Sequence, residues 1–382
     1  MQAFIDGFLK FCESTGIALL FNPESYIWWQ TLIMIAVACV LLYLAIVKKF
    51  EPLLLVPIAF GMLLANLPQT SNLMHPEWFS DPAYFVDGQI NYGRVLNEGG
   101  LLDMLYLGVK LGIYPPLIFL GIGAMTDFGP LIANPKSILL GAAAQLGVFF
   151  TFLGALFIGD MGWANFGFNE ASSIGIIGGA DGPTAIFTTI KLAPHLLGPI
   201  AIAAYSYMAL VPVIIPLVVR LLCTKKELSI NMKEQEKKYP SKTEIKNLRV
   251  LKIIFPIVVT TVVALFVPSA VPLIGMLMFG NLVKEIGANT FRLFDAASNS
   301  IMNAATIFLG LSVGATMTSE AFLNWTTIGI VVGGFLAFAL SIAGGIFFVK
   351  LVNLFTKKKI NPLIGATGLS AVPMASRVAN DI

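Results

Sequence analysis

Charged residues are scarce in this chain. Only 12% of its 382 residues are Asp, Glu, Lys or Arg, whereas 57% are hydrophobic. A soluble domain has about a quarter charged residues, so the composition excludes an ordinary soluble globular protein. Apolar runs near the ~20 residues of a transmembrane helix recur along the sequence. The clearest of them are Ile27–Val47, Ser137–Ile158, Leu196–Leu222, Leu251–Val267 and Thr327–Val352. We therefore predict an all-α polytopic protein that crosses the cell (inner) membrane several times.

Cysteine and histidine are also rare. The three cysteines (12, 39 and 223) are too scattered for a disulfide framework, and the two histidines (75 and 195) are too few for a zinc site. The most glycine-rich segment is not followed by Gly-Lys-Ser/Thr, so the chain has no Walker-type nucleotide site. A net charge of +3 says little, because the location of the basic residues matters more than their sum; no nucleic-acid partner is expected. Because it has no nucleotide site, any pumping by this chain must be powered by a partner, by a gradient or by chemistry at the chain's own site.

The order of polar and apolar stretches predicts four parts. Residues 1–100 hold an N-terminal segment, the first membrane helices and a polar loop, and residues 101–222 form a first membrane half. Residues 223–250 form a basic loop, and residues 251–382 form a second membrane half. The first ten residues lack the pattern of a signal peptide, and their apolar positions favour a helix lying in the membrane interface.

Basic residues indicate which side of the membrane each loop faces. Residues 48–49, the stretch 224–249 with eight Lys or Arg against four Glu, and residues 357–359 are predicted to be cytoplasmic. The insert 68–100 has four acidic residues against one arginine and fits the opposite side. Five apolar segments lie between residues 48–49 and the long basic loop, both predicted to be cytoplasmic. An odd number of crossings would put the loop outside, so one of the five must enter and leave on the same side. Segment 171–190 is predicted to be re-entrant, because its glycines and proline disfavour a continuous helix.

The two membrane halves resemble one another at an offset of about 190 residues. Residues Ile118–Gly121 recur as Ile307–Gly310, and in both halves a glycine (175, 365) is followed eight residues later by a proline (183, 373). The charge pattern makes the two copies run in opposite directions, which predicts an inverted repeat. Its broken segments, 171–190 and 361–378, would meet near the bilayer midplane, where such repeats place their substrate sites.

Asp181 is the residue that most directly indicates a function. It is a single carboxylate inside a long apolar, helix-breaking stretch, and both features are tolerated at membrane depth where they line an ion path. Sodium takes oxygen ligands, including carboxylate, amide, hydroxyl and freed backbone carbonyls. We predict that Asp181 handles a sodium ion or a proton; the alternative is a helix-capping aspartate.

The second broken segment supplies further candidates, each with a structural alternative. Asn361 precedes Pro362, which makes it either a sodium ligand or a helix cap. Ser370 is either a ligand or a small packing residue. Arg377 is either a basic anchor near the cytoplasmic surface or a partner for an anionic group. Tyr207, which with Tyr205 follows the Asp181 segment, is either a proton-path hydroxyl or a packing residue.

Several of these segments carry long, specific motifs. The run GGADGPTAI (178–186) resembles the signature of the β subunit of sodium-pumping, biotin-dependent decarboxylases, which act on oxaloacetate, methylmalonyl-CoA, glutaconyl-CoA and malonate. The same is true of GIGAMTDFGPLIANP (121–135), YSYMALVP (205–212), NPLIG (361–365) and SAVPMASRV (370–378). The likeness runs from residue 27 to 378. The resemblance implies a translocase in which this chain decarboxylates carboxybiotin, consumes a proton and exports Na⁺.

The resemblance also implies roles for single residues. Asp181 would bind sodium and take part in proton uptake, and Tyr207 would be a hydroxyl on the sodium or proton path. Asn361 and Ser370 would be sodium ligands or polar groups on the pathway, and Gly365 would be part of the metal site by allowing close approach.

Arg377 would contact carboxybiotin or provide a counter-charge. The family pattern continues past the end of this sequence with a helix carrying Gly-Pro-Asn-Val-Ala-Gly, so one expected asparagine ligand is not in it.

Partners follow from the same resemblance. They are a cytoplasmic carboxyltransferase with a biotin carrier, a small membrane γ subunit, membrane lipid and further copies of this chain in an elevator-like homotrimer. Na⁺ would be the transported and activating ion, and biotin would arrive as carboxybiotin on a partner subunit. The alternative function is a sodium-coupled secondary carrier of an organic anion, without chemistry.

Overall fold

The fold is described from a computed structural model. It describes residues 28–49, 52–68, 74–75, 77–86, 89–135, 138–238, 247–368, 375 and 378–379. The predicted interfacial helix at the N-terminus lies outside these residues. The chain divides into two compact units, one of Met1–Leu111 with Ile307–Gly329 and one of Gly112–Thr306 with Ile330–Ile382. Helices α20 (Met302–Ala315) and α22 (Trp325–Phe355) run from one unit into the other.

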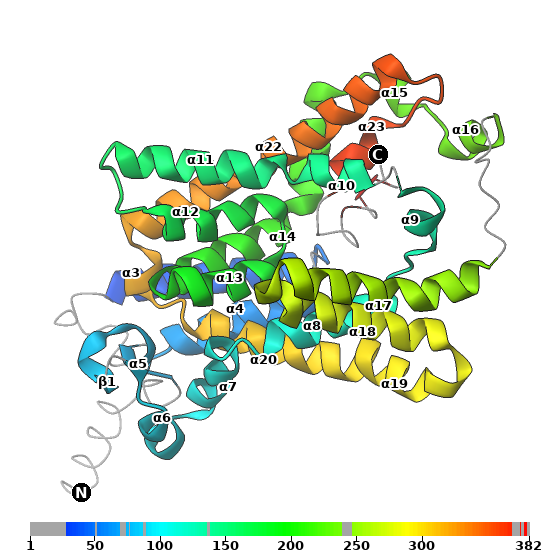
Figure 1. Cartoon of the computed structure of the whole chain (residues 1–382). Coiled ribbons are helices and arrows are strands. Elements are labelled where there is room, and N and C mark those ends of the chain that lie inside the picture. Colours follow the sequence, from blue (N-terminus) through cyan, green and yellow to red (C-terminus); the bar gives the residue numbers. More distant parts are fainter. Residues whose placement is uncertain are drawn as a thin grey trace, which may run out of the picture. The chain divides into compact units, whose positions relative to one another are not determined.

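The described residues are predominantly helical, as the sequence predicts. All five of the clearest apolar runs form helices in Figure 1. Within the described residues, six helices are long and apolar enough to cross a membrane, and two further pairs of helices qualify as spans that are bent. The bends are 70° between Leu101–Lys110 and Tyr114–Met125, and 64° between Pro194–Tyr205 and Leu210–Leu222.

The first unit combines membrane helices with a small polar insert. Its elements are α3 (Trp28–Ile46), α4 (Pro52–Asn66), α5 (Glu77–Ser80), η2 (Pro82–Tyr84), β1 (Phe85–Val86), β2 (Gln89–Ile90), α6 (Tyr92–Glu98), α7 (Leu101–Lys110) and α21 (Ser319–Phe322). The two strands pair antiparallel, with Phe85 opposite Ile90. Asp103 is fully buried and accepts hydrogen bonds from the Gly100 amide and from the His75 amide and Nδ1, at 2.7–2.9 Å. Its role is therefore structural.

The second unit holds two groups of helices. One consists of α8 (Tyr114–Met125), α9 (Gly129–Ala133), α17 (Leu248–Phe266), η6 (Pro268–Ala270), α18 (Val271–Ile286), η7 (Ala288–Thr290), α19 (Phe291–Asp295) and the π-helical η8 (Ala296–Ile301). Glycines let α8 and α18 touch: a Cβ on Gly123 would collide with the Leu277 carbonyl, and one on Gly280 with the Leu120 carbonyl. Close backbone approach through small residues is typical of membrane helices.

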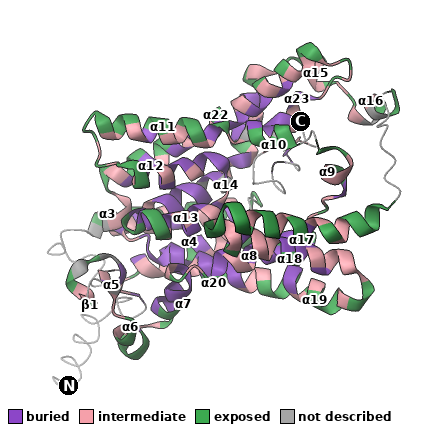
Figure 2. Cartoon of the chain, in the orientation of Figure 1, coloured by how far each residue is buried: buried purple, intermediate pink, exposed green. Residues whose placement is uncertain are grey.

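The other group surrounds the broken segment. It consists of α10 (Ile138–Ala144), α11 (Leu146–Asp160), α12 (Phe168–Gly175), η4 (Ile176–Gly179), α13 (Gly182–Leu192), η5 (Pro194–Leu196), α14 (Leu197–Leu222), α15 (Lys225–Leu228), α16 (Met232–Lys238), α22 and α23 (Pro362–Ala366). Figure 2 shows α13 and α14 largely buried, whereas much of α11 and α17 is exposed. The exposed residues on α17 are mainly apolar, which is the composition of a lipid-facing helix.

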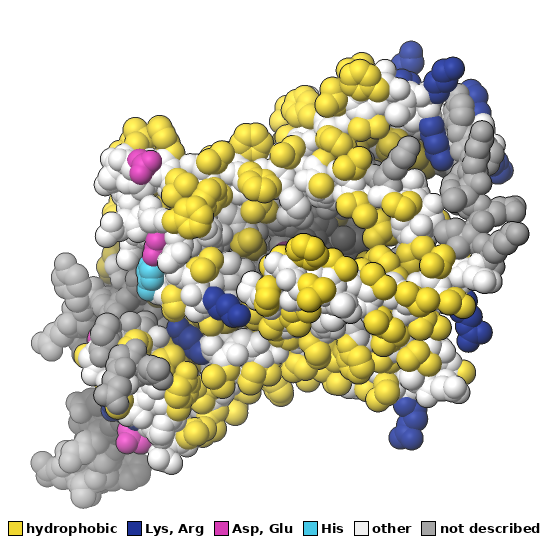
Figure 3. All heavy atoms as spheres, viewed as in Figure 1, with side chains coloured by type: hydrophobic (Ala, Val, Ile, Leu, Met, Phe, Trp, Pro, Cys, Tyr) yellow, Lys and Arg dark blue, Asp and Glu magenta, His cyan; other side chains and the backbone are white. Residues whose placement is uncertain are grey.

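Surface chemistry agrees with this arrangement. In Figure 3, hydrophobic side chains cover most of the helices in view, and basic side chains gather at the edge where α15 and α16 lie. These two helices belong to the basic loop that the sequence places on the cytoplasmic side.

Candidate functional site

Asp181 lies at a break between two helices. The chain tightens from α12 into the 3-10 helix η4 and then reverses at Ala180, whose φ of 56° lies in the left-handed region. Asp181 follows in an extended conformation and begins α13, with Pro183 in the first turn. A left-handed residue stops a helix and proline suits the start of the next one. The prediction that segment 171–190 is not a continuous helix is therefore confirmed.

The Asp181 carboxylate caps α13. One oxygen accepts a hydrogen bond from the Thr184 amide at 3.1 Å, and the other accepts one from Thr184 Oγ1 at 2.7 Å. This confirms the capping interpretation, but each carboxylate oxygen keeps a lone pair for a further partner. The preceding helix also ends here, so its last carbonyls have no further turn to bond. The Asp181 carboxylate is the charged oxygen group that a cation at this break would meet.

The tip of the broken segment rests on α11. A Cβ on Gly178 would lie 2.5 Å from the Gly147 carbonyl and 2.6 Å from Thr151 Oγ1. A Cβ on Gly179 would lie 3.1 Å from Gln145 Oε1. The absence of side chains on both glycines thus brings η4 into direct contact with α11.

Gln145 is a polar residue that the sequence analysis did not select. It occupies the turn that separates α10 from α11, and its side-chain oxygen lies beside Gly179, two residues before Asp181. A single amide within the apolar run 137–158 is the signal that would have indicated it. It adds a neutral oxygen to the surroundings of the break.

Tyr205 and Tyr207 follow on α14, beside its 64° bend. Their side chains are only 2% and 3% exposed, and within the described residues neither hydroxyl has a hydrogen-bonding partner. The Asp181 carboxylate is close enough to act electrostatically on Tyr205. The Tyr207 ring packs edge-on against the Phe335 ring of α22, with the ring centroids 6.5 Å apart. Buried hydroxyls are nearly always paired, so these two unpaired hydroxyls, of which that of Tyr205 is near the Asp181 carboxylate, are candidate contacts for a ligand.

Asn361 is the N-cap of α23, with Pro362 as the first helical residue. Its Oδ1 accepts a hydrogen bond from the Leu363 amide at 3.0 Å, and its Nδ2 donates to the carbonyls of Leu228 at 2.9 Å and Ile230 at 3.2 Å. The capping interpretation is therefore confirmed, and the side chain also attaches α23 to the segment around α15. Its role as a sodium ligand stays a prediction.

Gly365 permits close packing. A Cβ on Gly365 would collide with the Gly345 carbonyl of α22, and a Cβ on Gly345 would collide with the Gly365 carbonyl. The close approach that the sequence predicts at this position is thus between two helices. Ser370 and Arg377, the other two predicted site residues, lie outside the described residues.

Comparison with known proteins gives consistent matches along the whole chain. Residues 30–382 match the model of the Na⁺-transporting oxaloacetate decarboxylase beta subunit family. The methylmalonyl-CoA decarboxylase subunit beta of Propionigenium modestum is 54% identical over 376 residues, which cover 98% of this chain and 90% of that relative. The glutaconyl-CoA decarboxylase subunit beta of Acidaminococcus fermentans is 50% identical over 379 residues, covering 99% and 89%. The probable oxaloacetate decarboxylase beta chain of Vibrio cholerae is 47% identical over 391 residues, covering 94% and 88%. The chain belongs to the beta subunit family of Na⁺-transporting decarboxylases.

Proposed function

We propose that this chain decarboxylates carboxybiotin presented by a partner subunit and exports Na⁺ through the break at Asp181. As a family member it is a membrane subunit of a sodium-pumping decarboxylase. The observation that carries the assignment of the site is the Asp181 carboxylate at a helix break, followed on α14 by two tyrosine hydroxyls that have no partner among the described residues.

Sodium is the cargo, and oxygen atoms would bind it. Asp181 supplies the one negative charge, and the end of η4 supplies carbonyls at the same place. Asn361, Ser370 and Gly365 belong to this proposal through the family motifs that contain them. Helix ends facing each other across a break are a recurrent way of holding Na⁺ in membrane carriers.

The chemistry requires a proton. Cleavage of the N–COO⁻ bond releases CO₂, leaves an electron pair on the ureido nitrogen, and one proton must reach that nitrogen to form N–H. We assign the delivery of this proton to Asp181, with Tyr207 on the path and Arg377 as counter-charge or contact for the carboxylate. Because a carboxylate that holds Na⁺ cannot hold a proton at the same oxygen, binding of one ion favours release of the other.

An inverted repeat with two re-entrant segments and elevator-type movement is part of the same proposal. What supports the repeat is the order of elements at the offset of about 190 residues. Helix α8, short α9 and Asn134 precede α10 and α11, as α20, short α21 and Asn324 precede α22.

A biotin-dependent complex implies further subunits. We propose a cytoplasmic carboxyltransferase with a biotin carrier and a small membrane γ subunit, with this chain as a homotrimer. A secondary carrier without chemistry, the alternative from the sequence, does not agree with the decarboxylase names of the relatives.

The test is decarboxylation of carrier-bound carboxybiotin by the purified complex, with and without Na⁺. We expect sodium-stimulated turnover that Asp181→Asn abolishes while the complex still assembles. Asp127→Asn is the control, because Asp127 is an exposed acid paired with Lys252 at 2.6 Å and not at the break. Near-normal turnover in Asp181→Asn would exclude the proposed site, and absence of turnover in the wild-type complex would exclude the function.

A further inference from the structure

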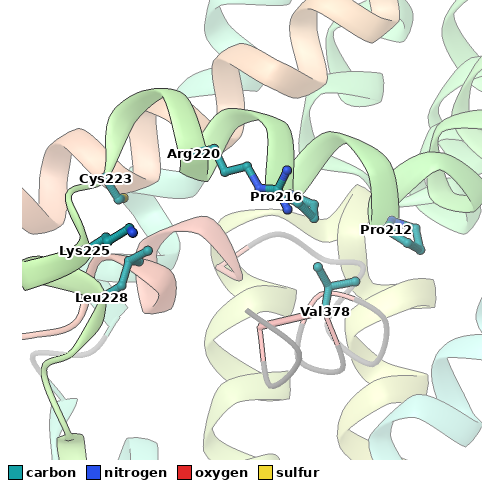
Figure 4. Close-up of a pocket in the computed structure, with 7 residues that line it drawn as sticks. All are labelled: Pro212, Pro216, Arg220, Cys223, Lys225, Leu228 and Val378. Atoms are coloured by element: carbon teal, nitrogen blue, oxygen red, sulfur yellow. The ribbon is translucent and has the colours of Figure 1, made fainter.

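A cavity of about 540 Å³ lies at the end of α14. Figure 4 shows that its lining comes from α14, from the segment that includes α15, and from the C-terminal part of the chain. Two basic side chains, Arg220 and Lys225, and one thiol, Cys223, line it. The remaining walls are Pro212, Pro216, Leu228 and Val378. A volume of this size is typical of sites for small organic ligands.

The two basic side chains are not neutralised. Within the described residues, neither the Arg220 guanidinium nor the Lys225 ammonium group has a hydrogen bond or an ion pair, and both residues are exposed to solvent. The nearest acid along the chain, Glu227, bonds instead to Lys350 at 3.0 Å and to the Thr224 amide at 2.8 Å. The cavity therefore carries two positive charges, and it suits an anion.

Apart from its two basic side chains and one thiol, the cavity is lined by proline and aliphatic side chains, which suit an apolar part of a ligand. Pro216 has no N–H, so the Pro212 carbonyl lacks its usual helical donor, and both residues line the cavity. A carbonyl of this kind accepts a hydrogen bond from a ligand. The other walls, Leu228 and Val378, are aliphatic.

These properties together describe the ureido ring of carboxybiotin. We propose that this cavity is where the carboxylated ring enters, with Arg220 and Lys225 binding its N-carboxylate and the Pro212 carbonyl accepting its remaining ureido N–H. The inference rests on the proposed function, because it names the place where the substrate of that function is first bound.

The position of the cavity agrees with this role. It lies at the end of α14 that leads into the basic loop, which the charge pattern places on the cytoplasmic side where a soluble carrier acts. The same helix carries Tyr205 and Tyr207 further along its length. Helix α14, bent by 64° between its two halves, thus connects the cavity to the two tyrosines.

Steady-state kinetics give the first test. In the purified complex, with carboxylated biotin amide as substrate, Arg220→Met and Lys225→Met should each raise KM roughly tenfold and leave kcat nearly unchanged, since each removes one charge-assisted hydrogen bond. Lys226→Met is the matched control, because Lys226 is the next residue on α15 and does not line the cavity. Arg220→Lys should recover part of the affinity. An unchanged KM in both methionine variants, or an equal rise in Lys226→Met, would overturn the proposal.

Labelling of Cys223 gives a second test that needs no turnover. In complex whose Cys12 and Cys39 are replaced by serine, carboxylated biotin amide should slow alkylation of Cys223, and unmodified biotin amide should protect less. Burial raises the pKa of this thiol, so the labelling is done under mildly alkaline conditions. Protection should persist in Asp181→Asn, where the proposed chemistry is blocked. Equal labelling with and without the ligand would overturn the cavity assignment while leaving sodium-stimulated turnover, and hence the proposed function, intact.

Discussion

A buried hydroxyl without a partner is the sharpest residue-level feature of this protein. Tyr205 and Tyr207 have almost no exposed surface, and within the described residues their hydroxyls are unpaired. Leaving such a group unsatisfied costs about 1–3 kcal/mol. Such an unfavourable arrangement is expected where a transient ligand supplies the missing bonds, and the Tyr205 hydroxyl is near the Asp181 carboxylate at the helix break.

Substitution by phenylalanine separates function from packing at these two positions. Tyr205→Phe and Tyr207→Phe keep the ring and remove only the unpaired oxygen, so we expect thermal stability in detergent to be unchanged or to rise by about 1 kcal/mol. Sodium-dependent decarboxylation should fall at the same time. Tyr43→Phe is the control, because Tyr43 is 51% exposed on α3. Unchanged activity in both variants would assign the two tyrosines to packing.

Several residue roles could be predicted from the sequence, because the residue type itself determines the local backbone structure. A proline after Asn361 and a glycine pair before Asp181 indicate a cap and a break, and the structure has both. Gln145 escaped prediction because its importance depends on a contact with Gly179, more than thirty residues away in the chain. Sequence patterns report what is local, whereas this contact exists only after α11 and η4 have packed.

At the scale of elements, the contact between η4 and α11 determines where Asp181 lies. The tip of the broken segment has no side chains at Gly178 and Gly179, so it can rest directly on the α11 backbone. The order and extent of the helices could be predicted from apolar runs. The bends have local signals as well: Gly112 has a φ of 69° before the start of α8, which carries Pro115, and Pro212 follows the break in α14. Such residues indicate where a helix can bend, whereas the angle of the bend could not be predicted from them.

Adding one methyl group at the tip tests this contact. Gly178→Ala would place a carbon against the Gly147 carbonyl and Thr151, so we expect a loss of about 1–3 kcal/mol in stability and weaker sodium dependence. Gly154→Ala on α11 is the matched control, since a Cβ there meets nothing within 4 Å. Thermal unfolding in detergent measures both. Equal stability of the two variants would show that η4 does not need this close contact.

A second element-level feature is the attachment of α15, which holds Lys225 in the proposed cavity. Glu227 accepts hydrogen bonds from the Thr224 amide and from Lys350 of α22, and these bonds lower the pKa of its carboxyl group below the ordinary 4.5. Because the pKa of Glu227 is lower in the folded than in the unfolded state, its ionised form stabilises the attachment of α15. The stabilisation that ionised Glu227 contributes is fully present above pH 4.5, the ordinary pKa of a glutamate. It is lost as the pH falls through the lowered pKa of Glu227 in the folded protein.

Glu227→Gln should therefore loosen α15 at neutral pH. Because both partners are partly exposed, we expect a local effect of about 0.5–1 kcal/mol. Hydrogen exchange of the amides at 224–230, corrected for its intrinsic pH dependence, should be faster in the variant at neutral pH and should converge with the wild type in acid. If the difference in exchange rate between the variant and the wild type instead grows as the pH falls, the expected direction of the pH dependence is wrong.

At the scale of the whole molecule, sodium binding and folding are linked. A ligand that binds only the folded state stabilises it by RT ln(1 + [L]/Kd), which is about 2.7 kcal/mol when the ion is in hundredfold excess over Kd. With Asp181 as the one charged ligand, the stabilisation by sodium depends on a single carboxylate. It is nevertheless measured as a change in the stability of the entire protein.

Thermal unfolding in detergent at increasing NaCl, with choline chloride to keep ionic strength constant, measures this linkage without turnover. The wild-type protein should show a midpoint that rises with sodium, and Asp181→Asn should show almost none of that rise. A proton and a sodium ion compete for the same carboxylate, so the rise should weaken as the pH is lowered. Asp127→Asn should behave as the wild type, because Asp127 pairs with Lys252 away from the break. Sodium protection that survives in Asp181→Asn would place the ion elsewhere in the fold, and protection that is insensitive to pH would separate the sodium site from the group that takes up the proton.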